Sequence, residues 1–169
     1  MPRIAPLVLL LLLLESPPAL MGQEATAPRR IATVTAGIGN TMGWLGLQGE
    51  RYFAHERLSA FLGFGYTPSI DQGDPSGPTF ALGFRGFTTG VKHRGFLALS
   101  VSQLFVESGF TEDPSRLYGP GVEAGYQFAS RGGFTFMIGA GLGYAPGVPE
   151  GESEVGSMIE LGFGYTWRR

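Results

Sequence analysis

The chain has 169 residues, a formal net charge of −2, no cysteine and 28 glycines, and Lys92 is its single lysine. This length corresponds to one domain. The lack of cysteine excludes a disulfide framework, thiolate metal sites, thiol catalysis and a lipidated cysteine anchor. The small net charge argues against nucleic-acid binding.

The first residues have the three parts of a secretory signal peptide. Arg3 forms a charged start, Ile4 to Leu14 form an apolar stretch, and Ser16 to Pro18 break it. The apolar stretch is shorter than the roughly 20 residues that a membrane-crossing helix needs. We expect residues 1–22 to be the leader, with cleavage between Ala19 and Ala27.

From Ile31 onward, apolar residues recur with a period of two, which is typical of β-strands. Blocks of about ten residues with this pattern alternate with turn-forming segments, so the sequence predicts eight strands. In chain order the blocks cover residues 32–38, 43–53, 58–67, 80–85, 97–105, 118–128, 134–144 and 155–167.

Each block sets bulky apolar side chains on one face and mostly small ones on the other. In the last block the bulky set is Val155, Ile159, Leu161, Phe163, Tyr165 and Trp167. A soluble, ligand-holding barrel of the lipocalin kind would point such residues inward and carry a polar exterior. Glycine, alanine and serine instead suit the narrow interior of a barrel whose bulky residues face lipid. The pattern therefore favours an eight-stranded antiparallel up-and-down transmembrane β-barrel over residues 29–169.

Long and short connections alternate between the predicted strands, as in bacterial outer-membrane barrels. The long ones are residues 68–78, 107–116 and 145–154, and the short ones lie near 55–57, 89–93 and 130–132. An even strand number places both termini on the periplasmic side. The acidic residues of the long loops are Asp71, Asp74, Glu107, Glu112, Asp113, Glu150, Glu152 and Glu154. The opposite rim is expected to carry Arg29, Arg30, Arg51, Arg57, Lys92, Arg94, Arg131, Arg168 and Arg169.

From about residue 31 to 169 the chain resembles the small eight-stranded outer-membrane barrels, the class of OmpX and the OmpA transmembrane domain. The C-terminal strand, with its alternating apolar residues and Trp167 near the end, carries the most specific likeness, although Arg168 and Arg169 follow the aromatic. The resemblance implies a location in the outer membrane of a Gram-negative-type bacterium. It also implies recognition of the C-terminal strand by the outer-membrane assembly machinery.

Six polar residues fall on the predicted inward face, where a charge must be paired or hydrogen-bonded. They are Glu50, Arg85, Glu123, Glu160, Gln48 and Gln127. We expect a structural polar network in the lumen, in which Arg85 bridges carboxylates. The alternative is a gated pore that opens when Arg85 changes its carboxylate partners.

Aromatic residues near the block ends are expected to form interfacial girdles. These are Trp44, Tyr52, Phe53, Tyr66, Tyr126, Tyr144, Tyr165 and Trp167. The lipid A deacylase and palmitoyltransferase barrels place a serine, a histidine and an acid together at the outer face. The two histidines here, His55 and His93, fall in predicted periplasmic turns, which argues against such a triad.

The sequence thus predicts a non-enzymatic, monomeric barrel that contributes to envelope integrity or to surface interaction through acidic outer loops. Its expected partners are outer-membrane lipid and lipopolysaccharide, and no catalytic, cofactor or metal residues are predicted. Three alternatives stay open: a narrow, porin-like channel, a lipid A-modifying enzyme, and a soluble exported lipocalin-like binder.

Overall fold

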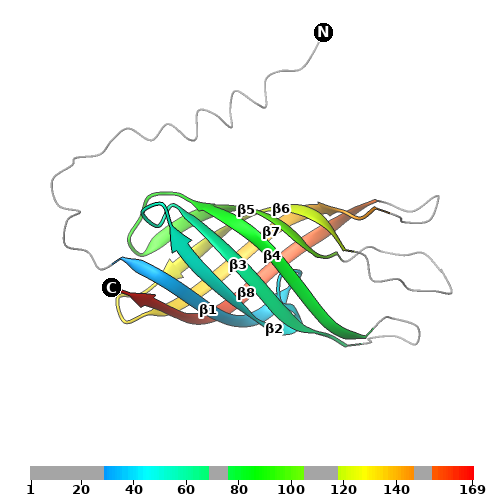
Figure 1. Ribbon diagram of the computed structural model, residues 1–169, viewed down its shortest axis with the longest axis horizontal. Coiled ribbons are helices and arrows are strands. Elements are labelled where there is room, and N and C mark those ends of the chain that lie inside the picture. The colour runs from blue at the N-terminus through cyan, green and yellow to red at the C-terminus, as the bar shows by residue number, and fades with distance from the viewer. Residues whose placement is uncertain (1–28, 69–75, 105–117, 147–153) are drawn as a thin grey trace, which may run out of the picture.

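The computed structural model describes residues 29–68, 76–104, 118–146 and 154–169. These residues form eight antiparallel strands that close into one barrel, in which each strand pairs with its chain neighbours and the last pairs with the first (Figure 1). The strands are β1 (Arg30–Gly39), β2 (Gly43–Phe53), β3 (Leu58–Thr67), β4 (Gly77–Phe87), β5 (His93–Gln103), β6 (Tyr118–Ala129), β7 (Phe134–Tyr144) and β8 (Val155–Arg168). The predicted all-β, eight-stranded closed barrel is confirmed.

Several expectations fall outside the described residues. They are the leader at residues 1–22 with its cleavage window, and all the predicted loop acids except Glu154. Within the described ranges, the chain has no helix long and apolar enough to cross a membrane.

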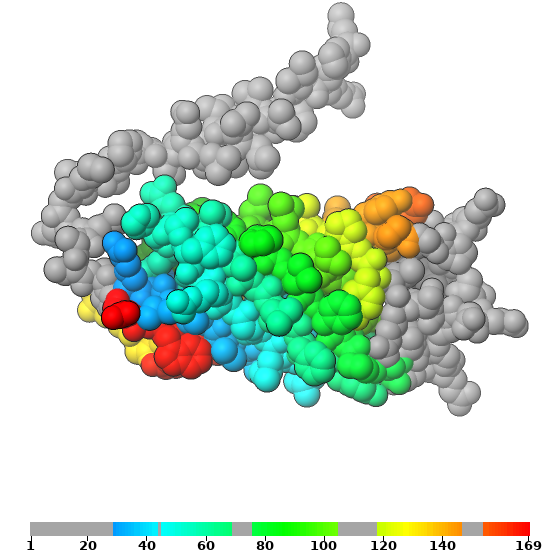
Figure 2. Space-filling view, viewed as in Figure 1, coloured from blue at the N-terminus to red at the C-terminus, as the bar shows by residue number. Residues whose placement is uncertain are grey.

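Burial alternates along the strands as the period-two pattern predicts. On β3, Leu62 and Phe64 point outward and are 64% and 65% exposed. Phe61, which directly precedes Leu62, points into the barrel and is buried. The other strands repeat this arrangement, with exposed leucine, phenylalanine, valine, isoleucine and tyrosine on the outside. The barrel therefore carries its bulky apolar side chains on its exterior, and Figure 2 shows outward side chains covering the wall on the visible face.

Inward glycines make room for the large side chains that do point inside. A Cβ atom on Gly83 would lie 2.6 Å from the ring of Phe61, and one on Gly125 would lie 2.3 Å from the ring of Phe96. Such distances are shorter than real Cβ contacts, so the inward positions of Phe61 and Phe96 depend on the glycines beside them. Small residues thus lie beside large ones in the narrow interior.

The two ends of the barrel differ. β1 begins and β8 ends at the same end, and the short connections β2–β3, β4–β5 and β6–β7 also lie there (Figure 1). We call this the turn end. The opposite end, where β1 ends and β8 begins, is called the loop end.

Candidate functional site

Arg85 of β4 lies at the centre of the lumen and is fully buried. Its Nη2 atom contacts Oε2 of Glu160 at 2.5 Å, and its Nη1 atom lies 3.6 Å from Oε1 of Glu50. The guanidinium group also stacks between two rings, 4.3 Å from the centroid of Phe61 and 4.9 Å from that of Phe96. Strands β2, β4 and β8 are thereby joined through the interior, because the cation is desolvated and must be held by its partners.

Glu123 of β6 completes the central layer but is held differently. Its side chain is buried, and Oε1 lies over Gly139, where a Cβ atom would be only 1.9 Å away. Neither carboxylate oxygen accepts a hydrogen bond from a donor among the described residues. Glu50, by contrast, accepts hydrogen bonds from Ser59 at 2.5 Å and from Tyr52 at 2.8 Å. The central layer thus contains three carboxyl groups around one arginine, and Arg85 contacts two of them directly.

The two predicted glutamines extend this layer toward the two ends. With its amide oriented to satisfy both sides, Gln48 accepts from Arg85 and donates to Glu160 at 3.1 Å and to Thr41 at 3.0 Å. Gln127 donates to the Tyr52 hydroxyl at 3.0 Å. The structure therefore brings the six polar residues of the sequence prediction into one interior and adds Ser59 and Tyr52 to them.

A second layer closes the interior at the turn end, and it corrects the placement of two arginines on the rim. Arg30 and Arg94 are buried inside the barrel, where both donate to Oε1 of Gln127, at 3.0 and 2.7 Å. Arg94 also lies 4.0 Å above the ring of Phe87. Tyr52 is buried among them and is not an interfacial aromatic, because its position on β2 has the same parity as Glu50.

The β2–β3 turn supplies the carboxylate, that of Glu56, that faces the two buried arginines of this layer. Ala54, His55 and Glu56 all have positive φ angles, of 48°, 56° and 67°, a backbone conformation that costs each such residue roughly 1–2 kcal/mol. Glu56 contacts both buried arginines: Oε1 accepts from the backbone nitrogen of Arg30 at 2.6 Å, and its carbonyl accepts from Arg94 at 2.9 Å. These contacts hold the strained turn over the mouth of the barrel.

A third layer occupies the loop end, where the β1–β2 turn folds into the lumen. Asn40, Thr41 and Met42 are all buried. The Oδ1 atom of Asn40 accepts from the backbone nitrogen of Ile159 on β8, and Nδ2 donates to the carbonyl of Gln103 on β5, at 2.9 and 3.0 Å. Because β5 and β8 are not neighbours in the sheet, the side chain of Asn40 connects two separate parts of the barrel wall at the loop end. We call residues 40–42 the plug.

Glycines on β3 make the plug possible. Cβ atoms built on Gly63 and Gly65 would each lie 1.7 Å from a carbonyl oxygen of the plug, that of Thr41 and that of Met42. The plug backbone therefore lies directly against the inner wall of β3. The sequence analysis did not predict this layer, and its only signals were the short β1–β2 connection and the glycines facing it.

Apart from Tyr52 and Trp44, the predicted girdle residues point outward. Tyr66 and Tyr144 lie at the loop end, whereas Tyr165 and Trp167 lie at the turn end, with exposed fractions between 46% and 51%. Tyr126 is also exposed and contacts His93 through its hydroxyl group. The side chain of Trp44 lies outside what the structure describes.

The two histidines lie at the turn end and on the outside. His55 is exposed in the β2–β3 turn, and His93 is exposed at the start of β5, where Nδ1 is hydrogen-bonded to the hydroxyl of Tyr126. Across the described part of the chain, no three histidine, aspartate or glutamate side chains gather as a metal site would require. The chemistry assembled inside the barrel is thus that of buried ion pairs and hydrogen bonds.

No protein-family model, curated protein or solved structure matches this chain. Its interpretation therefore depends on the geometry of its own residues.

Replacing Arg85 by alanine should destabilise the barrel by about 3–5 kcal/mol, because Glu50 and Glu160 would remain buried without their cation. Denaturant unfolding followed by tryptophan fluorescence measures this change. Arg57→Ala removes an exposed arginine at the turn end and is the matched control, with an expected change under about 0.5 kcal/mol. Equal stability of the Arg85 variant and the parent chain would contradict the bridging role.

Gly63→Ala should destabilise the barrel by about 1–3 kcal/mol, because the new methyl group would collide with the carbonyl of Thr41 and displace the plug. Gly49→Ala is the control, since a Cβ atom there meets nothing within 4 Å. Thermal unfolding of the two variants, followed by circular dichroism, compares them. If both variants unfold at the same temperature, the plug does not lie against β3.

Proposed function

We propose that this chain is an integral outer-membrane β-barrel with a structural, non-enzymatic role in the cell envelope. The observation that carries the proposal is the apolar exterior, where Leu45, Phe64 and Leu62 are 72%, 65% and 64% exposed and similar residues continue on all eight strands. A contiguous exposed apolar surface of this extent is unfavourable in water and favourable in lipid.

The strand lengths and the aromatic residues agree with a bilayer. The strands contain 10 to 14 residues, and a tilted membrane-crossing strand needs about 9–11. Exposed tyrosines lie at the loop end, and a tyrosine and a tryptophan lie at the turn end, where two interfacial girdles would sit. The closed sheet pairs its strands internally, as lipid demands of the backbone.

The interior argues against the soluble alternative. A lipocalin-like binder encloses an apolar cavity for its ligand, whereas this lumen contains arginines, carboxylates and glutamines in three connected layers. Most of its bulky apolar residues are on the outer face, where they cannot line such a cavity. The same layers cross the path that a narrow channel would use.

Contacts that join strands across the interior support a structural role. Arg85, Glu56 and Asn40 each connect strands that are not neighbours in the sheet, at three levels of the lumen. In the proposed orientation the turn end faces the periplasm and the long connections face outward. Lipopolysaccharide is then the partner at the loop end. A closed eight-stranded antiparallel barrel is consistent with the resemblance to the OmpX-like barrels, and the C-terminal strand β8 would be the segment that the assembly machinery recognises.

Leu62→Arg should impair membrane insertion, because a charge on the lipid face near mid-bilayer costs about 2–4 kcal/mol. Leu58→Arg is the matched control, since it lies at the turn end of the same face and strand, where the cost is about 0–1 kcal/mol. Flotation with phospholipid vesicles, combined with gel mobility of unboiled and boiled samples, measures insertion and closure.

The parent chain and Leu58→Arg should float with the vesicles and migrate differently before and after boiling, while Leu62→Arg should insert poorly. A parent chain that stays in the aqueous fraction, without a mobility shift, would refute the membrane proposal and restore the soluble binder.

The purified barrel should give no discrete conductance steps in planar bilayers, because three layers of side chains cross its lumen. Asn40→Ala should also give none, since it loosens only the plug and leaves the central and turn-end layers in place. Steps in the parent chain would favour the narrow channel. Steps in the Asn40 variant alone would show that the plug is the barrier.

A further inference from the structure

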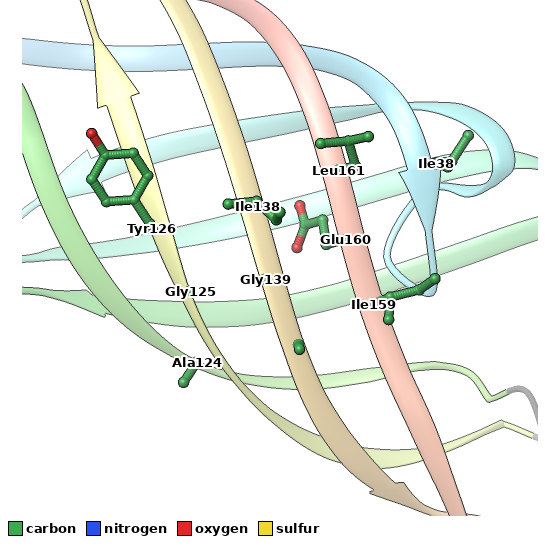
Figure 3. Close-up of a pocket in the computed structure, with 10 residues that line it drawn as sticks. Ile38, Ala124, Gly125, Tyr126, Ile138, Gly139, Ile159, Glu160 and Leu161 are labelled. Atoms are coloured by element: carbon green, nitrogen blue, oxygen red, sulfur yellow. The ribbon is translucent and has the colours of Figure 1, made fainter.

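The outer wall has a hollow over β6, β7, β8 and β1, with a volume of about 550 Å³ (Figure 3). It arises because Ala124 and Ala140 are register partners on β6 and β7 and present only methyl groups there. Larger side chains border it on several sides, and the lining is almost entirely apolar. The bordering residues include Tyr126, Ile138, Ile159, Leu161 and Ile38.

The turn end of these strands carries an arginine cluster, which we define as Arg29, Arg131 and Arg169. Arg168 has the inward parity of β8 and is only partly exposed. Arg29 and Arg169 are paired through their backbones, with both N–O distances at 2.8 Å. Arg168 donates to the carbonyls of Ala129 and Ser130, which ties the end of β8 to the turn that carries Arg131.

No acidic side chain among the described residues forms an ion pair with the cluster. Glu56 is the acid at this end, and it is engaged by the buried Arg30 and Arg94. Arg29, Arg131 and Arg169 are exposed. The strands that border the hollow therefore end at a positively charged rim.

The separation of these two features matches one leaflet of a bilayer. Seven residues separate Leu161 at the hollow from Arg168 at the rim, which is about 23 Å along a strand and roughly 16 Å along the axis at a 45° tilt. Half of the hydrocarbon core is about 15 Å thick. The same tilt displaces the hollow sideways by a similar distance, so a lipid with its phosphate at the cluster would reach the hollow with an acyl chain that lies along the strands.

We propose that this surface is a binding site for one anionic phospholipid of the leaflet that faces the turn end, with its phosphate on the arginine cluster and an acyl chain in the hollow. The inference rests on the proposed membrane function. Charge complementarity selects this occupant, because basic residues beside an apolar belt attract anionic head groups. A second copy docked symmetrically on this face would bring two arginine clusters together, which is unfavourable.

Native mass spectrometry of the detergent-solubilised barrel tests the site, with phosphatidylglycerol and phosphatidylcholine of identical acyl chains as probes. The parent chain should retain one phosphatidylglycerol and bind it at least about fivefold more tightly than phosphatidylcholine. The double variant Arg131→Gln/Arg169→Gln should lose that preference. The control Arg51→Gln/Arg57→Gln, which removes two exposed arginines on the β2–β3 side, should keep it.

A second pair of variants tests the hollow. Ala140→Leu fills it and should weaken binding of both lipids, whereas Ala60→Leu adds the same group to the outward face of β3 and should not. Equal retention of the two lipids by the parent chain would overturn the proposal, as would equal effects of the two arginine pairs. A dimer that Ala140→Leu abolishes would assign the hollow to a second copy and also overturn it. A barrel that inserts into vesicles but shows no lipid preference refutes only this site, while failure to insert refutes the proposed function.

Discussion

The narrow interior of an eight-stranded barrel is the constraint on which the rest of this structure depends. Eight strands enclose a space just wide enough for side chains to fill, so every large inward residue needs a small one beside it. Met158 occupies the space over Gly121, Leu104 that over Gly143, and Phe96 that over Gly125. The high glycine content is thus a packing requirement of the inner wall, and closure of the sheet retains strands that glycine would otherwise weaken.

The same narrowness explains why the interior is both polar and stable. A buried arginine cannot be reached by bulk water, so its charge must be met by carboxylates, carbonyls and aromatic faces that the neighbouring strands supply. Arg85 is met by Glu160, Glu50 and two phenylalanine rings, and Arg94 by Glu56, Gln127 and Phe87. The phenylalanine rings and Gln127 come from strands next to the arginines, whereas Glu50 and Glu160 come from strands across the lumen and Glu56 from the β2–β3 turn. The contacts of these three glutamates therefore act as internal cross-links of the sheet.

With its interior filled, the barrel can meet other molecules only through its outside and its ends. The exterior of the strands is mostly apolar. It includes the hollow at Ala124 and Ala140, and the arginine cluster lies at the turn end of the same strands, β6 to β8 and β1. These strands contain the seam where the first and last strands of the barrel pair.

The sequence by itself determined the strand number, the inside-out alternation and the inward positions of Glu50, Arg85, Glu123 and Glu160, because a period of two assigns each residue to a face. The same parity places Tyr52 and Arg94 inside, although the sequence analysis assigned Tyr52 to an interfacial girdle and Arg94 to the rim. Only the tertiary structure decided the position of Arg30, since a β-bulge between Arg30 and Ala32 turns that side chain inward against the parity of its strand. The tertiary structure also decided that the β1–β2 turn folds into the lumen as the plug and does not extend outward. This depends on the space at Gly63 and Gly65 and on backbone groups of Ile159 and Gln103. The closed barrel brings these groups to residues 40–42 from distant parts of the chain.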